Sequence, residues 1–184
     1  MERLNPKART DVFGKKINRD HSPVLVYGIP WLSVMLASLA PLLPVLTPAP
    51  LVPPLAYIVL LAWRLLRPGL LPLWAGLPLG LWDDLFSGQP MGSAILLFSL
   101  TLIAIDLLEL RFPWRGFWQD WLVSSLFMLI YIVLSALLSG AEINLLQMTL
   151  LTPQTLLSFV LFPVIVRLVA VLDRVRLLRV RRIS

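Results

Sequence analysis

Charged residues divide the chain into long uncharged stretches. Runs without Asp, Glu, Lys or Arg cover residues 24–63, 68–82, 85–105, 121–141 and 143–166. The first run is long enough for two helices, and the segment from Pro41 to Pro54 inside it holds six of the sixteen prolines. Because proline lacks a backbone N–H and clashes with the preceding turn, such a density ends a helix. The pattern therefore predicts six apolar helices, over residues 24–46, 51–66, 70–87, 92–110, 118–140 and 151–172.

Composition assigns these helices to a membrane. Apolar residues make up 58% of the 184 residues and charged residues 14%, with a mean hydropathy of +0.84. A typical soluble domain is about 45–50% apolar and about 25% charged. The sequence therefore predicts an all-α integral membrane protein. It comprises a basic tail over residues 1–23, a six-helix transmembrane bundle over residues 24–172 and a second basic tail over residues 173–184.

The distribution of basic residues predicts the orientation of this bundle. The sixteen Lys and Arg lie in the two tails, at the end of the last helix and in the connections around residues 64–67 and 111–115, whereas the connections near residues 47–50, 88–91 and 141–150 hold none. Short cytoplasmic loops carry the excess of Lys and Arg in membrane proteins. An even number of crossings with both termini in the cytoplasm places all sixteen on one side.

No specific ligand is needed to explain the charged residues at the C-terminus or at the end of the fourth predicted helix. The C-terminal stretch DRVRLLRVRR is explained by attraction to anionic membrane lipid, and nothing in the basic residues supports binding to nucleic acid. Asp106 and Glu109 lie at the cytoplasmic end of the fourth predicted helix, followed by Arg111 and Arg115. We expect these four residues to form juxtamembrane ion pairs.

Little in the sequence points to catalysis or to a cofactor. The absence of cysteine excludes disulfides and thiolate metal sites, and the single histidine, His21, lies in the polar N-terminal tail. Gly-rich phosphate loops, HExxH and GxSxG are absent. Asp83 and Asp84 begin like the DDxxD motif of prenyl transferases, but the fifth position is Ser87. We expect no enzyme activity, no cofactor and no metal.

The segment GLWDDLFSGQPMG, Gly80–Gly92, combines two acids that close an apolar helix with a run of turn-forming residues. From a helix start near Leu70, Asp84 lies roughly 21 Å along the axis, in the outer part of the hydrocarbon. Adjacent helix residues point about 100° apart, so at most one acid is expected to face into the bundle. Either the acids are hydrated at the outer surface, or a buried Asp84 orders the turn, or contacts a partner, by accepting N–H groups of GQPMG.

This segment resembles the GLxxD…Gx(P)xG pattern of the rod shape-determining protein MreD family. The matching residues are Gly80, Leu81, Asp84, Gly88, Pro90 and Gly92. Asp83 falls where the family usually has an uncharged residue, and the resemblance extends from about Pro23 to Val171. It marks Gly80, Asp84, Gly88, Pro90 and Gly92 as structural or partner-contact residues.

The resemblance implies a non-catalytic membrane scaffold subunit of the complex that elongates bacterial cells and maintains their rod shape. Family members lie in the bacterial cytoplasmic membrane and work with the bitopic protein MreC, the actin-like MreB and the peptidoglycan polymerase and transpeptidase of the rod complex. Small residues let membrane helices approach closely. We therefore expect the partner helix to dock around Gly76, Gly80, Gly92 and Ser93.

A second function follows from the same resemblance. The family looks similar in fold to the substrate-binding subunits of energy-coupling factor transporters, which are six-helix bundles. The alternative is thus a small-molecule, vitamin-type binding subunit of a transporter. Such subunits dock their energising partner through Ala-xxx-Ala spacing on the first helix, whereas Ala37 and Ala40 are spaced by three here.

Overall fold

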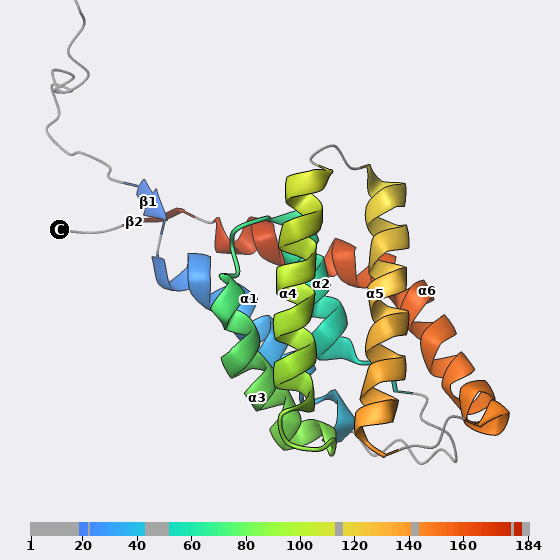
Figure 1. Ribbon diagram of the computed structural model, residues 1–184. Helices are drawn as coiled ribbons and strands as arrows, with labels where there is room; N and C mark the ends of the chain where they lie inside the picture. Colours follow the sequence, from blue (N-terminus) through green and yellow to red (C-terminus); the bar gives the residue numbers. More distant parts are fainter. Residues whose placement is uncertain are drawn as a thin grey trace, which may run out of the picture.

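The computed structural model (Figure 1) describes residues 19–21, 23–42, 52–112, 116–140, 144–177 and 179–181. Six α-helices form the described part of the chain: α1 Pro23–Ala37, α2 Leu55–Leu66, α3 Gly76–Ser87, α4 Ser93–Arg111, α5 Phe117–Leu138 and α6 Leu145–Arg176. Two short 3₁₀ helices, η1 Ala40–Leu42 and η2 Leu73–Ala75, and two strands, β1 Arg19–His21 and β2 Arg179–Arg181, complete it.

The six predicted helices are all present, and prolines account for several differences at their ends. α1 stops at Ala37, ahead of Pro41, and the end of the predicted helix 24–46 lies outside the described residues. α2 begins only after Pro53 and Pro54. In the third helix, Pro72 precedes η2, so the regular helix starts at Gly76. The residue before a proline is biased away from helical geometry, which explains these late starts.

Among the described residues, four helical segments are long and apolar enough to cross a membrane: Leu25–Leu42, Ser93–Arg111, Phe117–Leu138 and Thr149–Arg176. α2 and α3 have 12 residues each, about 18 Å of helix, whereas the hydrocarbon core of a bilayer is about 30 Å thick. The structure thus shows a helical protein with several apolar spans. Six complete crossings stay a prediction.

Ion pairs between helix ends show which ends of the helices lie at the same side of the bundle. Arg64, near the end of α2, pairs with Asp106 and Glu109 near the end of α4. Arg67, which follows α2, pairs with Asp173 near the end of α6. The C-terminal ends of α2, α4 and α6 therefore gather at one level, which we call the basic end of the bundle.

Two hydrogen bonds of α6, one near each end of the helix, show how it lies relative to α1 and α2. Gln154, early in α6, donates a 2.9 Å hydrogen bond to the carbonyl of Val52, which precedes α2. At the basic end, Arg176 reaches the carbonyl of Val26, in the first turn of α1, at 3.4 Å. α4 and α5 run side by side in opposite directions (Figure 1). Successive helices consequently traverse the bundle in alternate directions.

α2 lies at the centre of the bundle. Every residue from Ala56 to Arg64 is buried, the pattern of a helix surrounded on all sides. The ring of Tyr57 stacks on Tyr131 of α5 with centroids 4.0 Å apart, and its hydroxyl lies 2.9 Å from the hydroxyl of Thr101 in α4. The exposed faces of α3 to α6 are rich in leucine, as expected for surfaces against lipid.

The structure confirms an all-α bundle, and the described part of the two tails adds one antiparallel pair of short strands, β1 and β2. Each strand has only three residues, which is too short for an alternation of apolar and polar residues to mark it in the sequence. The pair forms between segments that flank α1 and α6 (Figure 1). The two ends of the described chain therefore lie together on one side of the bundle.

Candidate functional site

The turn between α3 and α4 depends on two glycines in the left-handed region. Gly88 caps the end of α3 with φ of 68°, and Gly92 precedes the first residue of α4 with φ of 97°. A side chain is strained at such angles, so glycine is the residue that fits both positions. Between them, the carbonyl of Pro90 accepts a 3.1 Å hydrogen bond from the N–H of Ser93. The chain reverses direction within this short segment.

The carboxylate of Asp84 holds the turn against the start of α4. Its Oδ2 accepts the N–H of Gly92 at 2.8 Å, and its Oδ1 accepts the N–H of Ala94 at 2.9 Å and the hydroxyl of Ser93 at 3.1 Å. The first N–H groups of a helix lack intrahelical partners and carry partial positive charge. Asp84 is only 4% exposed, so these groups replace water as partners of its charge.

Two glycines of α3 allow α4 to come close enough for this arrangement. A Cβ on Gly80 would lie 2.5 Å from the Cα of Ile95, and one on Gly76 would lie 2.8 Å from the Cα of Ser99. Both neighbours are backbone atoms, which cannot move aside independently. Of the surface predicted for a partner helix around Gly76, Gly80, Gly92 and Ser93, the part at Gly76 and Gly80 is therefore occupied by α4 of the same chain.

Asp83 is also buried, with an exposed fraction of 6%, and lies toward α1. The side chain of Ser38, just after α1, hydrogen-bonds to the Asp83 carboxylate. Next to it, the indole N–H of Trp82 donates to the carbonyl of Met35 at 3.2 Å. The expectation that at most one acid faces inward is wrong, because α4 and α1 cover two different sides of α3.

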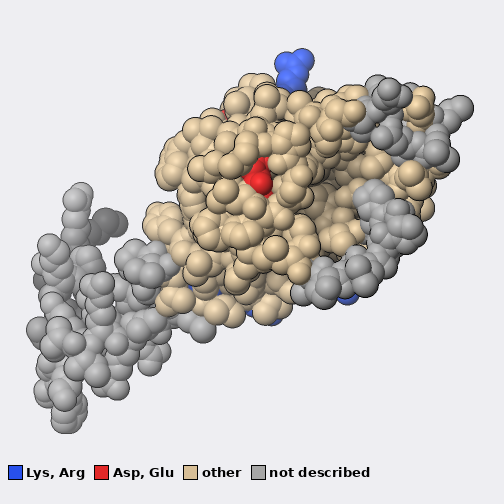
Figure 2. Space-filling model, turned by 90° about the horizontal axis from the view of Figure 1, so that it is seen from below, with Lys and Arg blue, Asp and Glu red and all other residues tan. Residues whose placement is uncertain are grey.

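The hydrated interpretation of the acid pair is wrong for the same reason. Figure 2 shows the face around the α3–α4 turn as almost entirely uncharged, with an acidic spot near its centre. Burial leaves little of either carboxylate in contact with solvent. The pair is thus part of the packing between α1, α3 and α4.

At the basic end, Arg64 connects α2 to α4. It is 3% exposed and contacts the carboxylate of Asp106 and, at 3.1 Å, that of Glu109. The ion pairs shown for these two acids are therefore made with Arg64 of another helix, whereas the predicted partner Arg115 lies outside the described residues. A buried guanidinium needs such charges, since an unpaired one is strongly destabilising.

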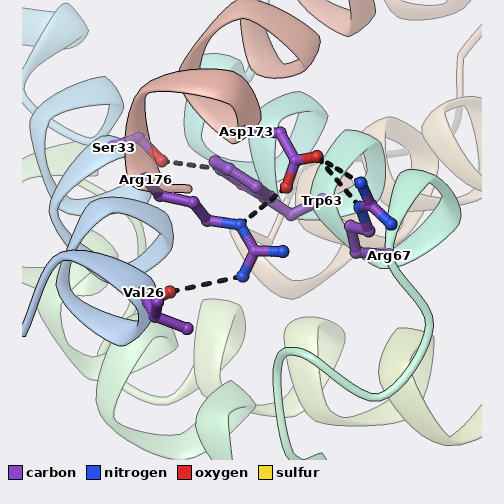
Figure 3. Close-up of polar contacts among 6 residues, drawn as sticks. All are labelled: Val26, Ser33, Trp63, Arg67, Asp173 and Arg176. Carbon is purple, nitrogen blue, oxygen red and sulfur yellow. Dashed lines mark hydrogen bonds and ion pairs between the residues drawn. The ribbon is translucent and has the colours of Figure 1, made fainter. Parts of the chain in front are cut away.

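Asp173 is shared by two arginines (Figure 3). Its Oδ2 accepts hydrogen bonds from the Nε and Nη2 of Arg67 at 2.9 and 2.7 Å, and its Oδ1 accepts one from the Nε of Arg176 at 2.6 Å. The hydrogen bonds and charge of Asp173 raise the pKa of Arg67 above its usual value. Arg67 stays cationic at any physiological pH, so this pair is not a pH switch.

Arg176 carries the contact on to α1 and α2. Its guanidinium lies 5.9 Å from the ring centroid of Trp63, a cation–π distance, and reaches the carbonyl of Val26. The buried indole N–H of Trp63 donates to the hydroxyl of Ser33 at 2.7 Å. One polar cluster thus ties the end of α6 to α1, α2 and the connection after α2 (Figure 3).

Replacing Arg67 with Gln is expected to change the free energy of unfolding by no more than about 1 kcal/mol. The Arg67 side chain is half exposed, and exposed ion pairs contribute about 0–1 kcal/mol. Arg176 continues to neutralise Asp173. Unfolding in mixed detergent micelles, followed by helical circular dichroism, measures this. A loss of several kcal/mol would contradict the expectation that Arg176 continues to neutralise Asp173 when Arg67 is absent.

The sequence did not predict the partners of these arginines. Arg64 and Asp106 are 42 positions apart, and Arg67 and Asp173 are 106 apart. Basic residues at helix ends are explained by orientation alone, so no local pattern distinguishes a buried arginine from an exposed one. The one feature of the sequence that could have indicated a buried arginine is the position of Arg64, which directly follows a long uncharged run and therefore lies near the hydrocarbon.

Within the described residues, no three His, Asp or Glu side chains lie close enough together to hold a metal ion. His21 lies in β1, close to the start of α1 in sequence. The residues that the structure brings together at the α3–α4 turn are Asp84, Gly92 and Ser93, with Gly88 and Pro90 in the same turn and Gly80 at the helix contact.

Comparisons with known proteins show to which family the chain belongs. Residues 23–176, from the first residue of α1 to the last residue of α6, match the family model of the rod shape-determining protein MreD. No curated protein and no solved structure matches the chain, so the likeness to transporter subunits stays a prediction. The match includes every described helix and the whole Asp84 turn, and the chain belongs to the MreD family of rod shape-determining membrane proteins.

Proposed function

We propose that this chain is a non-catalytic scaffold subunit of the bacterial rod complex. The observation that carries the proposal is the set of contacts made by Asp84, whose carboxylate accepts backbone hydrogen bonds from the N-terminus of α4. A carboxylate that accepts three hydrogen bonds at 2.8–3.1 Å from the start of α4 fixes the shape of the hairpin. The family match supplies the biological setting, cell shape.

The proposed topology is six crossings of the cytoplasmic membrane with both termini inside. Its support is the alternate direction of the helices and the position of five arginines at the basic end, Arg64, Arg67, Arg111, Arg174 and Arg176. The described part of the opposite connections, residues 88–92 and 139–140, holds no charge. By the positive-inside rule, the basic end faces the cytoplasm.

In this role, the chain couples an MreC-like bitopic protein to the MreB-like actin homologue and to the peptidoglycan polymerase and transpeptidase. Because Gly76 and Gly80 already hold α4, the motif acts as a structural support. The single helix of the bitopic protein then docks on a lipid-facing surface of the finished bundle. Gly80, Asp84, Gly88, Pro90 and Gly92 contribute indirectly, by fixing α3 against α4.

Depletion of the chain from growing cells tests this function. We expect rods to widen and round within a few generations, and the MreC-like protein to lose its co-purification with the polymerase and transpeptidase. Added vitamins should not restore shape. Normal rods after depletion, or recovery on a vitamin mixture, would instead support a transporter subunit.

A further inference from the structure

α3 lies beside only one half of α4. A Cβ on Gly80 would meet the backbone of Ile95, and one on Gly76, the first residue of α3, would meet the backbone of Ser99. From Ser99, α4 continues to Arg111, about 18 Å further at 1.5 Å per residue. Figure 1 shows α3 beginning partway along α4. The half of α4 toward the basic end therefore has no α3 beside it.

The side of α4 that faces α3 continues into this uncovered half. Helix residues three, four or seven positions apart lie on the same side. Counted from Ser99, this spacing selects Ile103, Asp106 and Leu110. Ile103 and Leu110 are exposed, and the side chain of Asp106 is 42% exposed. α4 thus presents an acid between two apolar residues on a side that the other described helices leave open.

η2 lies at the base of this open side. It packs against α4, and its Leu73 and Trp74 are exposed. A segment about 18 Å from the end of α4 lies within the hydrocarbon, which is about 30 Å thick. Residues 67–72, which lead to η2, form no regular helix, and such backbone in the hydrocarbon needs protein or water to cover it. We define the α4 surface as Leu73, Trp74, Ile103, Asp106 and Leu110.

Asp106 gives the α4 surface a negative charge with an open contact. Within the described part of the chain, the cation that it contacts is Arg64, through Oδ1 alone. Arg64 also contacts Glu109, so two carboxylates share one guanidinium. Opposite charges attract more strongly beside apolar groups than in water. The second oxygen of Asp106 therefore favours a cation at this depth.

A single membrane-spanning helix fits both features of the α4 surface. Its apolar side chains match Ile103 and Leu110, and it covers the backbone that leads to η2. Lys and Arg concentrate at the cytoplasmic flank of such helices, which is the level of the basic end in the proposed topology. A lipid chain offers no cation, and a second copy related by two-fold symmetry brings its own Asp106 to the same level.

We propose that the α4 surface is the docking site for one membrane-spanning helix of a partner protein, and that a Lys or Arg at the cytoplasmic end of this helix pairs with Asp106. The inference rests on the proposed scaffold function and specifies the surface of the bundle that serves it. The partner helix completes the side of the bundle that α3 leaves open.

Photo-crosslinking in growing cells tests the position of the partner helix. p-Benzoylphenylalanine replaces Ile103 in the full chain or, as the matched control, Leu168, which is exposed on α6 and equally far from its helix end. The probe is the MreC-like bitopic protein, detected by immunoblot, with the crosslinked peptide mapped by mass spectrometry. We expect a product from Ile103 that maps to the membrane-spanning helix of the bitopic protein, and none from Leu168.

Charge exchange tests the ion pair. Asp106→Asn should lower the yield of this product by about fivefold, the effect of losing one partly exposed ion pair. Asp106→Lys should abolish the product, and replacing the basic residue of the partner helix with Asp should restore it. Restoration requires a folded chain, so it separates loss of the pair from damage to the Arg64 contact. An unchanged yield with Asp106→Asn, or no restoration by the exchange, would overturn the pairing.

Co-purification of the chain with the bitopic protein, measured in the same cells, distinguishes this inference from the proposed function. If the two proteins co-purify but Ile103 yields only lipid adducts, crosslinked dimers of the chain or no product, the docking site is wrong and the scaffold function stands. Equal products from Ile103 and Leu168 would also overturn the docking site. If the two proteins do not co-purify, the scaffold function fails and the docking site fails with it.

Discussion

Asp84→Ala is expected to lower the free energy of unfolding by about 3 kcal/mol or more. The substitution leaves the N–H groups of Gly92 and Ala94 and the hydroxyl of Ser93 without their charged acceptor. Each buried donor that loses its partner costs about 1–3 kcal/mol. Inside the membrane domain, water cannot easily replace the carboxylate. The measurement is unfolding in mixed micelles by increasing the fraction of a denaturing detergent, followed by helical circular dichroism.

Asp83→Ala is the matched control for this experiment. Asp83 is on the same helix and is equally buried, but the contact described for its carboxylate is the side chain of Ser38. Removing a buried charge with so few partners also removes its desolvation cost, so we expect a change below about 1 kcal/mol. Equal losses in the two variants would show that burial, and not the α4 cap, determines the effect of Asp84.

Gly80→Ala is expected to cost about 1–3 kcal/mol, although it adds a single methyl group. The new Cβ would lie 2.5 Å from the Cα of Ile95 and 2.7 Å from the carbonyl carbon of Ala94. Both are backbone atoms of α4, so the two helices must separate, and overpacking of this kind costs about that amount. Separation also lengthens the hydrogen bonds of Asp84 to the same turn of α4. The same unfolding assay measures the loss.

Gly28→Ala provides the control for a glycine in a helix. Gly28 lies within α1, and a Cβ there meets no atom within 4 Å. Alanine is the better helix former, so we expect no loss and a gain of up to about 1 kcal/mol. If Gly80→Ala behaves like Gly28→Ala, the close contact between α3 and α4 does not limit the stability of the bundle.

The sequence predicts the number and approximate position of the helices because charge is expensive in lipid, so uncharged runs mark the helices directly. Helix ends are predicted less well. Pro78 illustrates the reason: a proline inside the predicted helix 70–87 suggests a kink, but Pro78 lies in the first turn of α3, where its missing N–H is not needed. The regular helix starts only at Gly76, after Pro72 and η2, a position that the uncharged run alone does not mark.

The role of Asp84 could be anticipated in part, since an acid followed by turn formers has backbone N–H groups within reach. Its actual donors include Ala94, inside α4 and beyond the GQPMG segment. The packing of Gly76 and Gly80 against α4, and the ion pair of Arg64 with Asp106, depend on which helices become neighbours. That information is distributed over the whole bundle, so spacing along the chain does not contain it.

The central claim is that Asp84 shapes the α3–α4 hairpin and that the scaffold function depends on this shape. Cell width in strains whose only copy carries Asp84→Ala or Asp83→Ala tests it most directly, with the amount of each protein in the membrane measured alongside. We expect round or widened cells with Asp84→Ala and rods of normal width with Asp83→Ala. Rods of normal width with Asp84→Ala would contradict the claim.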